Sequence, residues 1–232
     1  MNWGTIAIGT RIGEGRCDPM FFRSWQRLIT SGMRTGDVVL DPACEMPHHF
    51  AANWLVQEFY KTGADTLCMV DSDMVFKHET LNWLRDAPGG MTYGTLSALC
   101  TTRRHPYSPV LLRWRNEEWV CHNNARGDGV FEVDAASLAF CLIRRSVFDV
   151  IEAKYKCNGW FFDWGAQGLG EDTQFSFRAK TCLIKLGVHL GVKIGHRGMM
   201  TFGWDNEKLK PTFSDQSQLN TFGTSGNNKK EG

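Results

Sequence analysis

The stretch TLCMVDSD, residues 66–73, carries the strongest structural signal in this sequence. Its first five residues form an apolar run of the length of a buried strand, and the acidic triplet Asp71-Ser72-Asp73 follows at once. Alternate side chains of an extended segment point the same way, so the two aspartates can converge. Neighbouring carboxylates repel one another unless a cation or a proton relieves them. At the carboxyl end of a central strand we therefore expect a divalent ion; the alternative is an ordinary acidic loop.

The segments around this strand predict an α/β fold. Apolar runs at 5–9, 37–40 and 137–143 predict further buried strands. Amphipathic stretches between them predict helices, the first of which begins at Asp18-Pro19, an N-cap followed by a first-turn proline. Strands that alternate with helices predict a mostly parallel central sheet with helices on both faces. Short β-like runs separated by turns predict a middle segment rich in β-hairpins, over 91–133.

The C-terminal part of the sequence changes character twice. A helix is expected over about 171–186, with Gly187 as its stop, and an alternating apolar run follows over 188–194. Past Asp205 the chain turns polar. We therefore expect one domain over 1–205 and a polar, flexible tail over 206–232, with 214–232 its most flexible part.

Composition is that of an ordinary globular protein. The 232 residues suffice for one core, and a net charge of +1 gives no global field that would single out nucleic acid or an acidic membrane. No secretory signal is recognisable and the apolar runs are too short to span a bilayer, so we expect a soluble, cytoplasmic protein with no membrane anchor. The eight cysteines lack a Cys-x-x-Cys pair and are expected to be reduced. Cys44, His48 and His49 leave open a zinc site, although no fourth ligand is evident.

Two further positions carry groups suited to chemistry. Glu171-Asp172 opens a predicted helix after a glycine-rich loop, where carboxylates commonly serve only the helix dipole. The dipole should lower the pKa of Asp172, yet this carboxylate is placed to accept a proton late in a transfer to an alcohol. His196 follows the alternating run; a lone histidine is usually structural, but beside two aspartates it can complete a metal site.

Four segments, in this order, carry a family resemblance: GADTLCMVDSDMVF at 63–76, EVDAASLAFCLIRRSVFDVI at 132–151, WFFDWGAQGLGEDTQFSFRAK at 160–180 and VKIGHRG at 192–198. Over residues 4–204 the chain resembles nucleotide-sugar glycosyltransferases with the GT-A fold. It looks most like the inverting family 2 type, in a small stand-alone form of phage or prokaryotic kind. The resemblance implies a protein that works in the cytoplasm, which would be the host's cytoplasm if a phage encodes the protein.

The resemblance implies a metal-dependent hexosyl- or pentosyltransferase that moves a sugar from a nucleotide-sugar, expected to be a UDP-sugar, to an acceptor hydroxyl. It implies that Asp73, with Asp71, holds Mn²⁺ or Mg²⁺ on the donor diphosphate and that His196 is the late metal ligand. It implies that Asp172 is the general base, with Glu171 touching the donor sugar or the acceptor.

The resemblance also implies where the nucleotide binds. Thr10 and Arg11 match the nucleotide-binding edge, and Asp41 is a weaker contact. Many relatives carry Arg-Asn where this chain has Ala52-Asn53, so Asn53 remains while the arginine contact is lost or comes from His48, His49 or Arg11. Trp164 is expected to line the sugar site, the alternative being that it belongs to the core.

Other functions stay open at this point. The run DSDMV at 71–75 also fits the nucleophile motif of haloacid-dehalogenase-like phosphatases, although that motif belongs on the first strand. A non-catalytic carbohydrate- or nucleic-acid-binding module would need no base. The acceptor could be a glycan, a protein or hydroxymethylated DNA, and the oligomeric state is open. An anionic acceptor is suggested by a locally basic middle segment, which contains Arg103, Arg104, His105, Arg113, Arg115 and Arg126.

Overall fold

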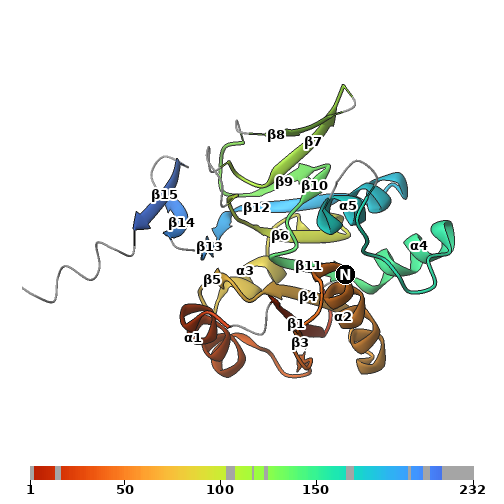
Figure 1. The fold of residues 1–232 in the computed structure, drawn as a ribbon, viewed down its shortest axis with the longest axis horizontal. Helices are drawn as coiled ribbons and strands as arrows, with labels where there is room; N and C mark the ends of the chain where they lie inside the picture. Colours follow the sequence, from red (N-terminus) through yellow and green to blue (C-terminus); the bar gives the residue numbers. More distant parts are fainter. Residues whose placement is uncertain are drawn as a thin grey trace, which may run out of the picture.

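A computed structural model of the chain describes residues 3–13, 17–102, 108–116, 118–122, 125–165 and 170–197, together with the backbone of 200–205 and 210–215. The centre of the molecule is an eight-stranded sheet (Figure 1). Its order is β2 (Val38–Val39), β1 (Ile6–Ile12), β4 (Thr66–Asp71), β11 (Phe140–Arg144), β6 (Thr95–Leu99), β12 (Leu186–Lys193) and β9 (Val130–Val133), with β3 (Ala43–Cys44) beside the end of β1. Only β11 and β9 run antiparallel to their neighbours in this sheet. The expected mostly parallel sheet is confirmed.

Helices cover both faces of this sheet, as expected. Alternate residues of β4 enter different cores: Leu67 and Met69 belong to one buried cluster, while Cys68 and Val70 belong to the other. The first cluster is closed by α2 (His48–Thr62), α4 (Arg145–Tyr155) and α5 (Glu171–Thr181). The second is closed by α1 (Pro19–Arg27), its π-helical continuation Leu28–Gly32 and α3 (Thr80–Arg85). Figure 1 shows the two groups of helices on opposite sides of the strands.

The helix boundaries follow local chemistry. Asp18 accepts hydrogen bonds from the backbone N–H groups of Met20 and Phe21, and Pro19 occupies the first turn of α1. Gly63 ends α2 in the left-handed conformation at φ 73°, which a residue with a side chain adopts only at a cost. The start of α1 agrees with the prediction from the sequence.

Two small sheets flank the central one. The hairpin β7 (Leu111–Arg115) and β8 (Glu118–Cys121) pairs with β10 (Ala135–Ala136), which confirms a hairpin in the middle segment. Beyond the carboxyl edge, β5 (Met74–Val75) pairs with β13 (Gly195–His196), followed by β14 (Met200–Asp205) and β15 (Lys210–Asp215). A short 3₁₀ turn, Gly90–Thr92, precedes β6. No helix within the described ranges combines the length and the apolarity needed to cross a bilayer.

Two boundaries differ from the expected ones. The helix expected to reach 186 ends at Thr181, because Leu183 turns to φ 60° and leaves its side chain 92% exposed. Gly187 is therefore not a helix stop but lies within β12, where an added Cβ would press on Val130 and Tyr93. β15, at Lys210–Asp215, lies within the segment that was expected to be a flexible tail. Residues 216–232, which include most of the expected flexible segment, lie outside the described residues.

Candidate functional site

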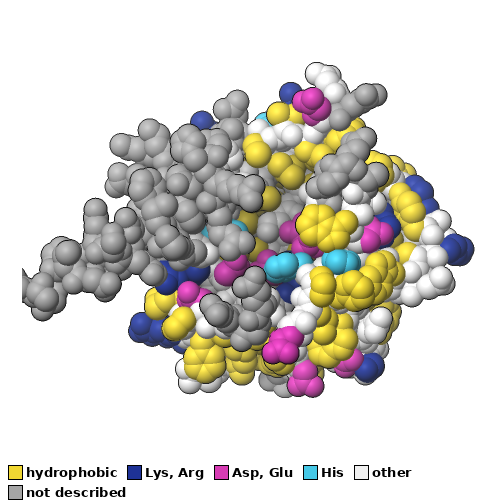
Figure 2. All heavy atoms as spheres, in the orientation of Figure 1, with side chains coloured by type: hydrophobic (Ala, Val, Ile, Leu, Met, Phe, Trp, Pro, Cys, Tyr) yellow, Lys and Arg dark blue, Asp and Glu magenta, His cyan; other side chains and the backbone are white. Residues whose placement is uncertain are grey.

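The predicted polar residues gather at the carboxyl edge of the sheet. Arg11 and Asp71 sit opposite one another in register near the ends of β1 and β4. His196 lies in β13, directly opposite Met74 and hence beside Asp73. Glu171 and the residue after it open α5. Figure 2 shows acidic and histidine side chains together around a hollow in the middle of one face. The fold thus brings together segments separated by more than a hundred residues.

Arg11 links the carboxylates of this edge. Its guanidinium is 2% exposed, and its Nε and Nη2 both lie 2.7 Å from one oxygen of Asp71. Nη1 donates to Glu171 Oε1 at 3.1 Å and lies 3.8 Å from Asp172 Oδ1. Burial alone lowers the pKa of Arg11, but the three carboxylates more than offset this and raise it above its ordinary value. The guanidinium is therefore a fixed positive charge bound to carboxylates, and its expected contact with a nucleotide stays a prediction.

Asp172 is held by one oxygen, and its other oxygen is buried without a hydrogen-bond partner among the described residues. Its Oδ2 accepts the backbone N–H of Leu138 at 3.0 Å, which ties the start of α5 to the entry of β11. Its Oδ1 has no hydrogen-bond partner among the described residues. Burial raises the pKa of Asp172 to about 7, and the negative charges of Glu171 and Asp71 add to this against the opposing effect of Arg11. The expectation that the helix dipole would lower this pKa is wrong because desolvation outweighs it.

Asp73 and His196 form a second polar pair. His196 Nε2 lies 3.2 Å from Asp73 Oδ2, and its Nδ1 lies 3.0 Å from the carbonyl oxygen of Thr101. A carbonyl can only accept, so Nδ1 carries the proton when the imidazole is neutral. Nε2 would then be an unprotonated acceptor that faces a carboxylate oxygen, which is also an acceptor. A proton or a cation between the two groups resolves this conflict.

These ligand types fit a divalent ion only in part. One carboxylate and one imidazole suit a manganese-like ion. Asp71, however, is bound by Arg11, so the structure does not show the expected convergence of Asp71 with Asp73. Within the described part of the chain no group of three or more His, Cys, Asp or Glu residues could hold a metal ion. The same finding leaves the alternative zinc site at Cys44 without support.

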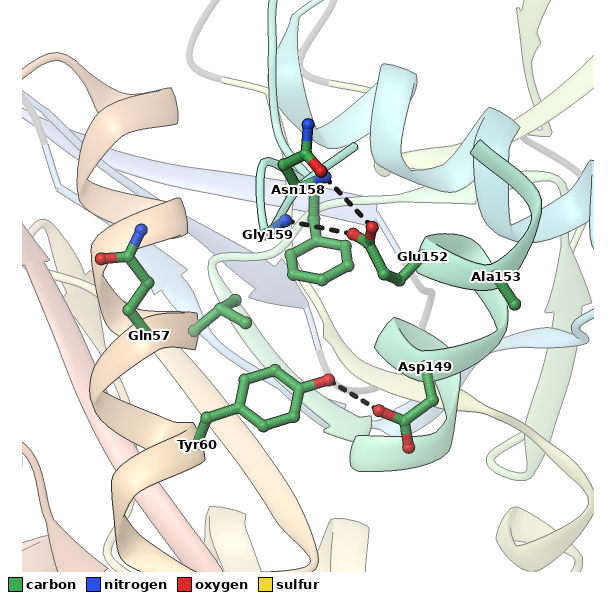
Figure 3. A pocket seen from close by; sticks show the side chains of 9 residues that line it. Gln57, Tyr60, Asp149, Glu152, Ala153, Asn158 and Gly159 are labelled. Carbon is green, nitrogen blue, oxygen red and sulfur yellow. Dashed lines mark hydrogen bonds between the residues drawn. The ribbon is translucent and has the colours of Figure 1, made fainter. Parts of the chain in front are cut away.

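The loop before α5 is fixed from three sides. The amide of Asn53, completely buried on α2, donates to the carbonyls of His49 and Phe162 and accepts the N–H groups of Phe161 and Phe162. This leaves no polar atom of Asn53 for the nucleotide contact expected there. Glu152 accepts the N–H groups of Asn158 and Gly159 (Figure 3).

Arg178, on α5, completes the attachment of this loop, and sequence reasoning missed it. It donates to the carbonyls of Trp160 and Phe161 and pairs with Asp163 at 2.6 Å. The available signal in the sequence was the pair of Asp163 and Arg178, an acid and a base fifteen positions apart in the segment 160–180. The pocket of Figure 3, about 640 Å³ between α2 and α4, is lined by this loop and not by the carboxylates bound to Arg11.

The remaining predicted contacts lie around this edge. Trp164 is 60% exposed and donates from Nε1 to His49 Nδ1 at 3.1 Å, so it belongs to the surface and not to the core. Thr10 is buried and its hydroxyl has no hydrogen-bond partner within the described ranges. Asp41 is exposed just after β2. An added Cβ on Gly13 would lie 3.7 Å from His48 Nε2, which places the start of α2 beside the end of β1.

The basic middle segment is only partly available to a ligand. Arg113 donates to the carbonyl of Glu132, lies 3.6 Å from Asp134 and covers the ring of Phe131, so it serves the fold. Arg115 and Arg126 are exposed. Arg103, Arg104 and His105 lie outside the described residues.

Comparisons with known proteins bear on the fold alone. The crystal structure of A197 from STIV superposes with a TM-score of 0.58 at 14% identity, covering 91% of this chain and 95% of that one. The crystal structure of GalNAc-T7 with UDP, GalNAc and Mn²⁺ gives a TM-score of 0.49 at 11% identity, covering 83% of this chain but only 44% of that one. No protein-family model and no curated protein sequence matches. The activity must therefore be argued from the site.

Proposed function

We propose that this chain is a glycosyltransferase that moves a sugar from a nucleotide-sugar to an acceptor hydroxyl with inversion. The donor that we propose is a UDP-sugar. The observation that carries the proposal is Asp172, a carboxylate with a pKa of about 7 and one oxygen without a hydrogen-bond partner among the described residues. A general base works best when its pKa lies near the working pH. The family resemblance of the sequence supports the same role.

The proposed reaction assigns one task to each group. The acceptor oxygen bonds to the anomeric carbon, the bond from that carbon to the diphosphate oxygen breaks, and its electron pair leaves with the nucleotide. The acceptor proton passes to the carboxylate of Asp172. Attack from the face opposite the leaving group inverts the anomeric centre, through a transition state with oxocarbenium character. Leu138 and Arg11 orient the base and favour its ionised form.

Asp73 and His196 would hold the metal, Mn²⁺ or Mg²⁺. His196 Nε2 and Asp73 Oδ2 are two acceptors that lie 3.2 Å apart, which is the reason to place a cation between them. When bound, the ion supplies charge that offsets the negative charge developing on the departing diphosphate. Glu171 is half-buried beside Arg11 and keeps its proposed contact with donor sugar or acceptor.

Two rival functions are less well supported. A haloacid-dehalogenase-like phosphatase would need a nucleophilic Asp71, but one oxygen of this carboxylate is bound by two N–H groups of Arg11. A non-catalytic carbohydrate- or nucleic-acid-binding module would have no use for a half-buried carboxylate of raised pKa. Phosphate release from small phosphoesters without a nucleotide-sugar would favour the phosphatase.

The test is a donor screen that measures nucleotide release with glycan, protein and hydroxymethylated-DNA acceptors. We expect release of UDP from at least one UDP-sugar, stimulated by one acceptor class. Nucleotide release that is absent for every donor and acceptor would contradict the proposal.

Metal dependence is a separate prediction. Asp73 and His196 supply two ligands, so donor binding and turnover should fall in excess chelator and recover with Mn²⁺. The measurement is the donor dissociation constant with and without chelator, with Asp73→Asn as the matched variant. Binding and turnover that are unchanged in chelator would remove the metal and leave Asp172 as the proposed base.

A further inference from the structure

A second pocket of about 460 Å³ lies between α1 and the segment that links β5 to α3. Its floor contains two buried residues, Ser24 and Phe76, and Ser24 Oγ accepts the backbone N–H of Phe76 at 3.2 Å. Its rim carries Arg23, Arg27 and Lys77, all exposed. None of the groups assigned to the proposed transfer lines it.

The cations of this pocket are not neutralised. Arg23 and Arg27 lie one turn apart on α1, so their Cβ atoms are about 5–6 Å apart and share a face. Neither guanidinium makes a hydrogen bond or an ion pair within the described residues. Lys77 lies over the ring of Trp83 at 5.5 Å, which leaves its charge unpaired. The one carboxylate of the pocket, Glu79, is engaged by His78 at 3.2 Å.

The pocket is tied to the proposed catalytic edge through short connections. Val75 lines it and stands two residues after Asp73. Asp18, which caps α1, lies 3.3 Å from Arg197 Nε, and the backbone N–H of Arg197 donates to the carbonyl of Asp73 at 2.7 Å. A ligand held by α1 would therefore lie next to the segment that carries Asp73 and His196.

We propose that this pocket, the α1–β5 pocket, binds phosphate groups of the acceptor. Paired arginines on one helix face match neighbouring phosphate oxygens, and a third cation across the floor of the pocket extends the site. That the phosphates belong to the acceptor rests on the proposed function, because the donor diphosphate is assigned to Asp73 and His196. The same chemistry is offered by a row of phosphodiesters and by a small phosphorylated acceptor.

The experiment measures how two probes bind to the full chain. The first is fluorescein-labelled single-stranded oligothymidylate. The second is inorganic pyrophosphate, used as a competitor of the first or as a direct ligand in calorimetry. The double variant Arg23→Ala/Arg27→Ala should weaken binding at least about tenfold. It should also reduce the magnitude of the slope of log K against log salt for the oligonucleotide by about 1.4, because each phosphate contact on a single strand contributes about 0.7. Lys77→Ala should weaken binding less. Arg34→Ala is the matched control, because Arg34 is exposed but paired with Asp86, and it should change binding less than about twofold.

The outcomes separate the sources of phosphate. Variant-sensitive binding of the oligonucleotide assigns a nucleic-acid strand, and variant-sensitive binding of pyrophosphate alone assigns a small phosphorylated acceptor. No binding of either probe, equal binding by the double variant or an equal loss in Arg34→Ala would overturn the proposal. Binding is measured without transfer, so a negative donor screen with an intact anion site would refute the glycosyltransferase while the pocket stands.

Discussion

At the scale of single residues, the surroundings that make Asp172 a candidate base also destabilise its ionised form. The side chain is about a quarter exposed, at 26%, and stands near two other carboxylates. Arg11 relieves only part of this repulsion, because its shortest contacts, at 2.7 Å, go to Asp71. A carboxylate held in this way binds a proton more readily than an exposed one, which is what proton transfer near neutral pH requires.

Asp172→Asn should lower the single-turnover rate by at least about a hundredfold, because the amide keeps the shape and the hydrogen bonding but cannot accept the proton. Donor affinity should change little. Asp73→Asn should show the opposite pattern, with donor binding lost first. Donor dissociation constants and single-turnover rates of both variants are the measurements. If Glu171→Gln is inactive while Asp172→Asn turns over normally, the base is the neighbouring residue.

The raised pKa of Asp172 also predicts how rate and stability depend on pH. The rate should rise as pH increases toward about 7 and then level off, since only the ionised carboxylate accepts a proton. In the unfolded chain this group ionises near its ordinary pKa of 3.8, so the folded state loses stability as pH rises from about 4 to about 7. Asp172→Asn should therefore raise Tm at pH 8 and leave it nearly unchanged at pH 4. An equal shift at both pH values would show that the carboxylate is not destabilised by burial.

At this scale the sequence predicted which residues gather but not what they bind. Asp73, His196, Asp172 and Arg11 do meet at one edge, because strand ends and a helix start lie together in this fold. The partner of Asp71 could not be predicted, since its choice of Arg11 over a shared cation depends on distances across β1 and β4. The pKa of Asp172 was misjudged for a related reason: local sequence shows a helix dipole but not burial.

At the scale of elements, the loop before α5 determines where the proposed base stands. Asn53, Glu152 and Arg178 hold it from α2, α4 and α5, with Asn53 satisfying four backbone groups in full burial. Such a network is stable only when every member is satisfied.

Asn53→Ala should lower the free energy of unfolding by at least about 2 kcal/mol, because buried backbone groups of the loop lose their partners. Gln57→Ala, exposed on the same helix, should change it by less than about 0.5 kcal/mol. Chemical denaturation of both variants is the measurement. Equal, small effects would mean that the loop does not depend on the amide of Asn53.

The elements themselves were largely predictable. β1, β4 and β11 were placed within a few residues, because apolar runs mark them locally. The end of α5 was missed because Leu186 continues the helical spacing of apolar residues while actually beginning β12. Pairing with β6 and β9 decides that segment, and no local pattern reports it.

At the scale of the whole molecule, the two cores join in one sheet and the C-terminal hairpin extends from its edge. Residues 216–232 contain few apolar side chains, which leaves little surface to bury against the domain. Truncation after Asp215, which keeps β15, should therefore shift Tm by less than about 2 °C. Differential scanning calorimetry of the truncated and full chains tests this, and a fall of several degrees would show that these residues pack on the domain.

The place of β11 has a consequence for synthesis of the chain. This strand alone joins β4 to β6, so the sheet consists of two parts until residues 140–144 are in place. During translation β4 and β6 leave the ribosome well before β11, their common partner, and both carry open edges of apolar strand during that interval. Nascent chains that stall before β11 should thus be prone to edge-to-edge aggregation and dependent on chaperones. The pairing of β11 with β4 and β6 joins segments that are far apart in the sequence. Refolding of the complete chain should therefore also be slow.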